Sequence, residues 1–152
     1  MTQSTYESDP PAPVFRWPVR IYYEDTDAGG VVYHANYIRF MERARTEFLR
    51  SLGIELSVME KERGVVFAIH SLAVEFLKPA RLDDHLEVTV ALAQPVRPAS
   101  ILFVQTIRRD GRVLCTGRMK VVSLSAQHFR PTAIPSFMFD RLAQSGKIVP
   151  QL

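Results

Sequence analysis

The chain has 152 residues, a length that suits a single domain. Hydrophobic residues make up 47% of it, too many for a disordered protein, and its net charge of +3 lacks the lysine and arginine clusters of nucleic-acid binding proteins. No apolar run approaches the roughly 20 residues that a membrane-spanning helix needs. The composition therefore predicts a globular domain with no nucleic-acid partner and no transmembrane segment.

Residues 1–14 are rich in serine, proline and acidic side chains, and we expect a flexible N-terminal extension there. They contain no apolar stretch flanked by basic charge, which argues against a signal peptide. The single cysteine, Cys115, lies in an alternating apolar run, so we interpret it as a small core residue rather than a nucleophile. One cysteine allows no disulfide within the chain, which fits a reducing compartment.

Residues 15–23 alternate and are rich in aromatic and β-branched side chains, which predicts a strand; Pro18 places it at a sheet edge or near a strand start. Tyr22 and Tyr23 cannot both face one way in a strand, so we expect one of them to pack inward. Over residues 35–52 apolar side chains recur at steps of three and four, which predicts a helix capped by Gly53. Its buried stripe comprises Tyr37, Met41, Ala44, Phe48 and Leu52.

A short second helix is expected over residues 57–63. After Gly64 the apolar period changes from 3.6 to 2, and Asp110–Gly111 has the composition of a two-residue hairpin turn. A C-terminal helix is expected over residues 136–142. Four runs predict strands: 65–78, 85–94, 100–109 and 112–125.

This order of elements predicts an α+β fold, with one long helix against a mostly antiparallel sheet of about five strands. We assign residues 15–145 to this single domain and residues 146–152 to a C-terminal tail. The helix covers one face of the sheet, whereas the other face and the edges need cover. We therefore expect a dimer that joins sheets or packs helices together.

The stretch EDTDAGG places three acids directly before a helix. A calcium loop that began at Asp25 would have Gly29, which offers no side-chain ligand, at position 5, and Asn36 instead of glutamate at position 12. A zinc site would have Asp27 and His34 but no obvious third ligand nearby. We therefore expect no metal.

The helix start suggests catalysis instead. The first turn of a helix has free N–H groups and a partial positive charge, and Gly29 and Gly30 leave room for another molecule. A carbonyl oxygen that develops negative charge could bind there, while the Asp27 carboxylate attacks the carbonyl or deprotonates an attacking water. His34 and Asn36 add polar side chains. The alternative is structural, because aspartate is common in turns and histidine or asparagine is common at helix starts.

The stretch from Tyr22 to Arg50, YYEDTDAGGVVYHANYIRFMERARTEFLR, resembles the 4-hydroxybenzoyl-CoA thioesterase family of hotdog-fold proteins, as do EFLKPARLDDHLEV, IRRDGRVLCTG and FRPTAIP further on. Within that family it is most similar to the acyl-CoA thioesterases encoded with the Tol-Pal envelope system. The match covers about residues 19–142. It implies a hotdog fold, a long helix wrapped by an antiparallel sheet, assembled as a homodimer or homotetramer. It also implies hydrolysis of an acyl-CoA without a metal or a separate cofactor, because coenzyme A is part of the substrate.

The resemblance gives the turn residues separate roles. It assigns the catalytic carboxylate to Asp27 and associates Tyr23, His34 and Asn36 with the catalytic site. A backbone N–H near His34 would polarise the thioester carbonyl. Glu24 and Asp25 are then expected to hold the turn or to stay solvated. Substrate binding is expected at Gly30, Val31, Tyr33, Lys78 and Arg118.

Coenzyme A carries phosphates, so basic residues are expected at the mouth of the site. Lys78 is the first candidate, because the strand end that carries it lies near the dimer seam in hotdog proteins. The others are Arg81, Arg97, Arg118 and Arg130. The two prolines of QPVRPAS depart from the family pattern and leave the role of Arg97 open.

Two other functions fit the same sequence. A hotdog domain can hold acyl-CoA or acyl carrier protein without turnover in an envelope or lipid-synthesis assembly, and a hotdog dehydratase removes water from a hydroxyacyl thioester. The length of the acyl chain stays open, as does the choice between nucleophile and general base for Asp27. The resemblance implies a cytoplasmic protein, with peripheral association at the inner membrane as an alternative.

Overall fold

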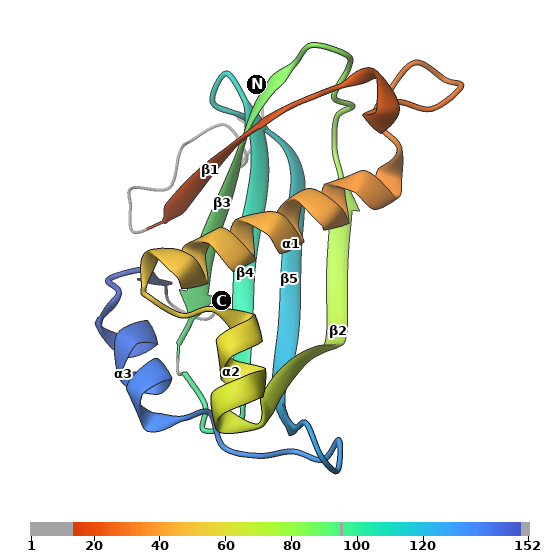
Figure 1. Ribbon diagram of the computed structural model, residues 1–152. Coiled ribbons are helices and arrows are strands. Elements are labelled where there is room, and N and C mark those ends of the chain that lie inside the picture. Colours follow the sequence, from red (N-terminus) through yellow and green to blue (C-terminus); the bar gives the residue numbers. More distant parts are fainter. Residues whose placement is uncertain (1–13, 95, 150–152) are drawn as a thin grey trace.

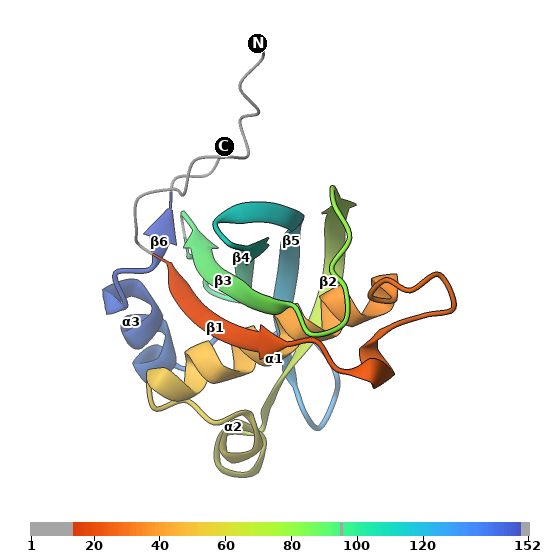
Figure 2. The same ribbon diagram turned by 90° about the horizontal axis from the view of Figure 1, so that it is seen from above.

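The computed structural model describes residues 14–94 and 96–149. Within them a sheet runs in the order β1-β3-β4-β5-β2, with all neighbours antiparallel. The strands are β1 (Phe15–Arg20), β2 (Val65–Phe76), β3 (His85–Ala93), β4 (Ser100–Arg109) and β5 (Arg112–Ser125). The sheet curls around the long helix α1 (His34–Ser51), which lies across one of its faces in Figure 1 and Figure 2. The predicted α+β architecture is confirmed.

The predicted apolar stripe is the face of α1 that meets the sheet. Tyr37, Met41, Ala44 and Phe48 are each less than 5% exposed, and Leu52 is half-buried. Burial of this stripe stabilises the helix, since isolated helices of this length are marginal in water. A methyl group at Gly117 in β5 would lie 2.8 Å from the Met41 sulfur, so the glycine lets α1 approach the sheet closely.

Two shorter helices, α2 (Leu56–Arg63) and α3 (Ser136–Gln144), lie beside the C-terminal end of α1 (Figure 1). Arg141 of α3 donates hydrogen bonds of 3.2 Å to the carbonyl oxygens of Leu52 and Gly53, where α1 ends. Its guanidinium also lies 5.2 Å from the ring centre of Phe137. Because these carbonyls have no partner within α1, Arg141 fastens α3 to the end of the long helix.

Two turns agree with the sequence predictions. Gly53 has the positive φ of +75° expected of a helix cap, and Asp110 and Gly111 have φ values of +51° and +78°, the signs that a type I′ hairpin requires. Pro18 lies in β1, an edge strand, as predicted. A short strand that we did not predict, β6 (Ile148–Val149), pairs in parallel with the end of β3 and lies within the expected C-terminal tail.

The first strand is shorter than predicted. It ends at Arg20, and Tyr23–Asp25 form one turn of 3-10 helix, η1. Tyr22 and Tyr23 are 61% and 81% exposed, so the prediction that one of them packs inward is wrong. The Asp25 carboxylate accepts a 2.8 Å hydrogen bond from the Tyr22 N–H, which turns the chain out of the sheet and ends the alternation of side chains.

Cys115 has no exposed surface, and burial raises the pKa of its thiol to about 12. The prediction that it is a core residue is confirmed. In residues 14–94 and 96–149, no helix combines the length and the apolarity needed to cross a membrane. Residues 1–13 of the expected N-terminal extension lie outside the described residues.

Candidate active site

The acid and glycine residues form a hairpin-like turn immediately before α1. Thr26 and Val32 pair as an isolated antiparallel bridge, and the Asp27 N–H donates to the Val31 carbonyl at 2.9 Å. Residues 27–31 are the tip of this turn. Both ribbon views show it, in orange, extending past the edge strand β2 (Figure 1 and Figure 2). The turn thus presents its tip beyond the body of the chain.

Asp25 and Asn36 hold the turn against α1. The Asp25 carbonyl accepts hydrogen bonds from the Tyr33 N–H at 2.9 Å and from Asn36 Nδ2 at 3.0 Å. Asn36 is 7% exposed, and its side-chain oxygen accepts a 3.3 Å bond from Arg39. The Asp25 side chain also accepts a hydrogen bond from the Tyr22 N–H, so Asp25 has the first of the two roles expected for it and Glu24, to hold the turn or to stay solvated. Asn36 has both ends of its amide engaged, so its contacts suit positioning.

Asp27, the predicted catalytic carboxylate, is exposed at the start of the tip. Its Oδ1 accepts a 2.8 Å hydrogen bond from the Gly29 N–H, and none of residues 14–94 and 96–149 donates to its other oxygen. A Cβ at residue 29 would lie 3.1 Å from Asp27 Oδ1, so glycine fits there. Gly30 has a φ of +79°, a left-handed conformation that favours glycine. The backbone therefore fixes one carboxylate oxygen and leaves the other available.

The start of α1 lies directly after this turn. Tyr33 precedes the helix and makes no side-chain cap, and no described group accepts a hydrogen bond from the N–H of His34 or Ala35. An 18-residue helix concentrates partial positive charge at these groups. The helix that follows the Asp27 turn in the chain therefore begins with N–H donors that have no acceptor among the described residues.

Aromatic rings surround the helix start. The exposed His34 ring lies 4.5 Å from the Tyr33 ring and 6.2 Å from the ring of Phe76, the last residue of β2. Phe76 is 49% exposed, and Tyr37 packs against it at 5.6 Å. His34 thus connects the turn to the end of the edge strand, a contact that the sequence alone does not reveal.

Two of the predicted basic residues, Lys78 and Arg118, lie in different places. Lys78 is exposed two residues after β2 and two residues before Ala80, whose carbonyl accepts a 2.9 Å hydrogen bond from the Val32 N–H of the turn. Arg118 lies on the face of the sheet opposite α1, because its neighbour Gly117 faces Met41. The structure thus brings Lys78 close to the Asp27 turn and places Arg118 across the sheet. No three His, Cys, Asp or Glu side chains in the described part of the chain are arranged to hold a metal ion.

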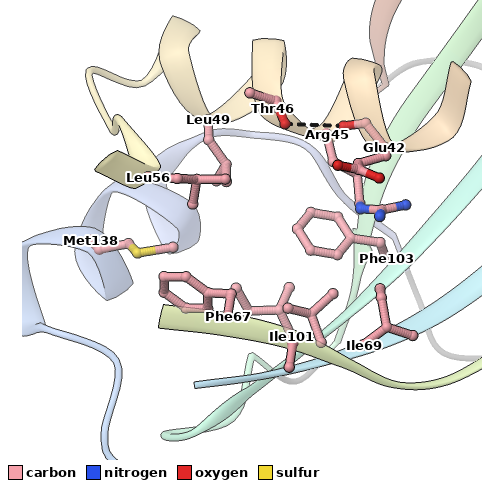
Figure 3. A pocket seen from close by; sticks show the side chains of 12 residues that line it. Glu42, Arg45, Thr46, Leu49, Leu56, Phe67, Ile69, Ile101, Phe103 and Met138 are labelled. Carbon is pink, nitrogen blue, oxygen red and sulfur yellow. Dashed lines mark hydrogen bonds between the residues drawn. The ribbon is translucent and has the colours of Figure 1, made fainter. Parts of the chain in front are cut away.

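A cavity of about 250 Å³ lies between α1 and the start of β2 (Figure 3). Glu42, Arg45 and Thr46 of α1 line one end of it. Apolar side chains line the remainder: Leu49, Leu56, Phe67, Ala68, Ile69, Ile101, Phe103, Val121 and Met138.

Arg45 is 9% exposed, and burial lowers the pKa of its guanidinium. It donates a 3.0 Å hydrogen bond to Gln105 Oε1, and the amide nitrogen of Gln105 donates to the Met41 carbonyl at 3.0 Å. Sequence reasoning missed this group. The sequence signal that could have identified Arg45 is its position beside the apolar stripe, one residue after Ala44 and four after Met41.

Comparison with known proteins gives a family match and curated relatives of the same kind. Residues 22–142 match the Thioesterase-like superfamily. The chain is 43% identical over 121 residues to the "Acyl-CoA thioesterase YbgC" of Haemophilus influenzae, covering 80% of this chain and 88% of the relative. It is 45% identical over 123 residues to the "Acyl-CoA thioester hydrolase YbgC" of Escherichia coli O6:H1, covering 80% and 90%.

Among solved structures, a probable thioesterase from Bartonella henselae is 28% identical, with a TM-score of 0.76 over 81% of this chain and all of the other. A gentisyl-coenzyme A thioesterase, BH1999, is 26% identical, with a TM-score of 0.75 over 84% and 99%. The family match spans the Asp27 turn, α1 and strands β2 to β5 together. The chain belongs to the thioesterase-like superfamily and has its hotdog fold.

Proposed function

We propose that this chain is an acyl-CoA thioesterase, which hydrolyses the thioester of an acyl-coenzyme A to free coenzyme A and a carboxylic acid. The observation that carries the proposal is the turn that exposes the Asp27 carboxylate and leads directly into α1, whose His34 and Ala35 N–H groups have no acceptor among the described residues. Relatives at 43% and 45% identity named as acyl-CoA thioesterases support the same reaction.

In this proposal the helix N–H groups and Asp27 have complementary tasks. The helix N–H donors stabilise the negative charge that develops on the carbonyl oxygen as the tetrahedral intermediate forms. Asp27 either attacks the carbonyl carbon or removes a proton from the attacking water. In the general-base route the C–S bond breaks as Asp27 returns the proton taken from water to the departing sulfur. In the nucleophilic route the C–S bond breaks to give the thiolate of coenzyme A and a mixed anhydride of Asp27. Water then hydrolyses the anhydride, which restores the Asp27 carboxylate, releases the carboxylic acid and supplies the proton of the thiol. Asn36 positions the turn, and Tyr23 and His34 flank it.

The substrate enters along the turn in this proposal. The backbone of Gly30 and Val31, together with the ring of Tyr33, lines the entrance. Lys78, near the turn, is our first predicted contact to the phosphates of coenzyme A. Arg118 lies on the opposite face of the sheet, so in this proposal it contacts the phosphates of a substrate bound to another copy. Replacing either by alanine is expected to raise KM for acyl-CoA and to leave kcat nearly unchanged, because such contacts stabilise bound substrate and transition state equally.

We further propose that two copies complete the site. The edge strand β2 is 12 residues long, has no neighbour on one side within residues 14–94 and 96–149, and exposes Ile69, Leu72 and Phe76. A two-fold axis through the middle of β2 would pair it antiparallel with the same strand of a second copy. That pairing places the Phe76 end of each strand, with its Asp27 turn, next to the Val65 end of the other. Tetramers would arise from two such dimers.

Several further predictions rest only on the resemblance to the thioesterase family. Coenzyme A belongs to the substrate, and the reaction as proposed needs no metal. Acyl carrier protein is a second possible acyl donor. Cytoplasmic location, peripheral association with the inner membrane, a role in lipid metabolism and a link to the Tol-Pal system stay predictions.

Release of free thiol from a panel of acyl-CoAs tests the function. Asp27→Asn should lower turnover by at least about a hundredfold, the lower scale of general acid–base catalysis. Asp140→Asn, which changes an exposed aspartate of α3, is the matched control and should retain the parent activity. A fully active Asp27→Asn enzyme would overturn the mechanism. Binding of acyl-CoA without turnover would favour a binding module, and loss of water without thiol release would indicate a dehydratase.

A further inference from the structure

The loop between β2 and β3 holds both ends of the Asp27 turn. Where the chain enters the turn, the Ile21 N–H donates a 2.9 Å hydrogen bond to the Asp84 carbonyl. Where the chain leaves the turn, the Val32 N–H donates to the Ala80 carbonyl at 2.9 Å. Ile21 and Val32 are buried, and Figure 1 and Figure 2 show the loop, in green, beside the start of the orange turn. The position of the turn therefore depends on the position of the loop.

Arg109, the last residue of β4, fastens this loop to the sheet. Its Nη1 donates to the Asp84 carboxylate at 2.6 Å and to the Pro79 carbonyl at 3.3 Å. The same carboxylate oxygen accepts a 2.8 Å hydrogen bond from the Arg81 N–H. The Arg109 and Asp84 side chains are 33% and 21% exposed, so solvent screens this ion pair only in part. One guanidinium thus holds both ends of the loop segment that binds the turn.

The loop contains a strained residue among these contacts. Asp83 has a φ of +70°, in the left-handed region that favours glycine. The Asp83 N–H donates to the Ile21 carbonyl at 3.1 Å, and the Asp84 N–H donates to the Arg81 carbonyl at 3.1 Å. Such backbone conformations persist where the surrounding contacts over-determine them. The ion pair of Asp84 is one of those contacts, so its loss should let the loop relax and move the turn with it.

We propose that Arg109 and Asp84 are positioning residues for thioester hydrolysis, which set the place of the Asp27 carboxylate through the loop between β2 and β3. This inference rests on the proposed function. The loop belongs to the stretch EFLKPARLDDHLEV, of which the proposed function uses only Lys78. Displacement of a reacting group by about 1 Å can lower the rate about a hundredfold, so a residue that acts through the loop can affect catalysis strongly.

The inference predicts an effect on turnover rather than on substrate binding. Lys78, the first predicted contact to the phosphates of coenzyme A, is held separately from the ion pair, because its N–H donates to the Leu114 carbonyl of β5 at 3.1 Å. Loss of the ion pair should therefore leave this contact in place. A change that misplaces Asp27 but keeps the binding contacts lowers kcat and leaves KM nearly constant.

Arg109→Met removes the donors and keeps much of the length of the side chain. For the acyl-CoA that the parent hydrolyses fastest, it should lower kcat at least about tenfold and leave KM within about threefold. Arg109→Lys keeps the charge and should recover part of kcat. Asp84→Asn should lower kcat in the same way and tests the pair if Arg109→Met fails to fold. Ile54→Val, which shortens a buried side chain just beyond the other end of α1, should lower the urea midpoint but keep the parent kcat.

Asp27→Asn provides the background that separates positioning from stability. If the ion pair acts through Asp27, Arg109→Met should change kcat by less than about twofold once Asp27→Asn is present. A general loss of folded enzyme would lower kcat by the same factor in both backgrounds. The double variant Asp84→Asn with Arg109→Met should lose no more activity than the more damaging of the two single variants, because both remove the same contact.

A spin label reports on the turn without any reaction. Ala28→Cys places the label on the exposed tip, and Cys115 is fully buried and should not compete for it. The electron paramagnetic resonance spectrum should show a more mobile label with Arg109→Met than in the parent. Ile54→Val should leave the mobility of the label unchanged.

Three results would overturn the inference: parent-like kcat in Arg109→Met and Asp84→Asn, an equal fractional loss in the Asp27→Asn background, or unchanged mobility of the label. Failure of the proposed function gives a different result. Either no acyl-CoA releases thiol, or Asp27→Asn alone is as active as the parent. The mobility of the label would then still decide whether the ion pair holds the turn.

Discussion

The N–H of Ala80 donates a 2.9 Å hydrogen bond to the phenol oxygen of Tyr37, so the middle of one loop is fastened to the first turns of α1. The carbonyl of the same residue accepts a 2.9 Å bond from Val32, which lies in the Asp27 turn. Ala80 is fully buried, and burial raises the pKa of the Tyr37 phenol. The backbone of one residue, Ala80, thus connects the long helix, the loop after β2 and the candidate catalytic turn.

Tyr37→Phe should therefore destabilise the fold. It leaves the buried Ala80 N–H without an acceptor, a change that costs about 1–3 kcal/mol. Urea unfolding should show a lower midpoint at an unchanged slope. Tyr33→Phe, at an exposed ring, is the control. Equal midpoints for Tyr37→Phe and the parent would show that water replaces the lost phenol.

Asp84 should make the free energy of unfolding depend on pH. Burial alone would raise the pKa of its carboxyl, but hydrogen bonds from the Arg81 N–H (2.8 Å) and the Arg109 side chain (2.6 Å) outweigh it and hold the pKa below its usual value. Because the pKa of Asp84 is lower in the folded state, its ionised carboxylate stabilises the fold. This stabilisation is complete above the pKa of the unfolded state, about 3.9, and is lost as the pH falls through the pKa of the folded state.

Asp84→Asn should accordingly lower the free energy of unfolding at pH 7 by about 1 kcal/mol or more, with a difference from the parent that shrinks below about pH 4. Denaturant unfolding at a series of pH values measures this. Asp83→Asn, which changes the exposed aspartate next to it, should show no such pH dependence. A constant difference from pH 7 to pH 2 would contradict the role of the ionised carboxylate.

Leu72→Glu tests the two-fold pairing of β2. The side chain is 43% exposed in the single chain, so the substitution leaves the fold of one copy intact, whereas it places a charge on the proposed seam. Light scattering should show monomers, and thiol release should fall at least about tenfold because the cavity and the Asp27 turn no longer meet. Leu72→Met keeps the apolar contact and should remain dimeric and active. A monomer with full activity would show that one chain contains the whole site.

Cys115 should not react with thiol reagents in the folded protein. The side chain has no exposed surface, and burial raises its pKa to about 12, so the nucleophilic thiolate is scarce. A chromogenic disulfide reagent should report about one thiol in denaturant and almost none in native buffer. Rapid labelling of the native protein would mean that β5 opens locally.

Local patterns predicted most of the fold. The period of α1, the cap at Gly53 and the Asp110–Gly111 hairpin are set by residues within one or two turns of one another, and all three are confirmed. The prediction for Tyr22 and Tyr23 is wrong because one side chain, Asp25, competes with the strand for the backbone N–H.

The candidate site was only partly predictable for a different reason. The turn and the helix start are contiguous in sequence, so their proximity could be foreseen. Arg45 and Gln105 are 60 residues apart, and their hydrogen bond exists only because α1 packs across β4. The contact of His34 with Phe76 likewise depends on where the edge strand ends. Sequence periodicity indicates which face of an element is buried but not which side chain of another element meets it.

The open side of β2 has a consequence for how the protein must be made. A newly synthesised subunit exposes the backbone N–H and C=O groups of edge strand β2, with the apolar side chains of Ile69, Leu72 and Phe76 beside them. Another extended peptide could pair with this strand. If the proposed dimer forms, rapid association with a second subunit shields this strand, so the same contact that we propose for the site would also protect the protein against aggregation. A substitution that slows the pairing of β2 with a second copy should therefore cause inclusion bodies during overproduction. Aggregation should appear before any loss of helical content is measurable.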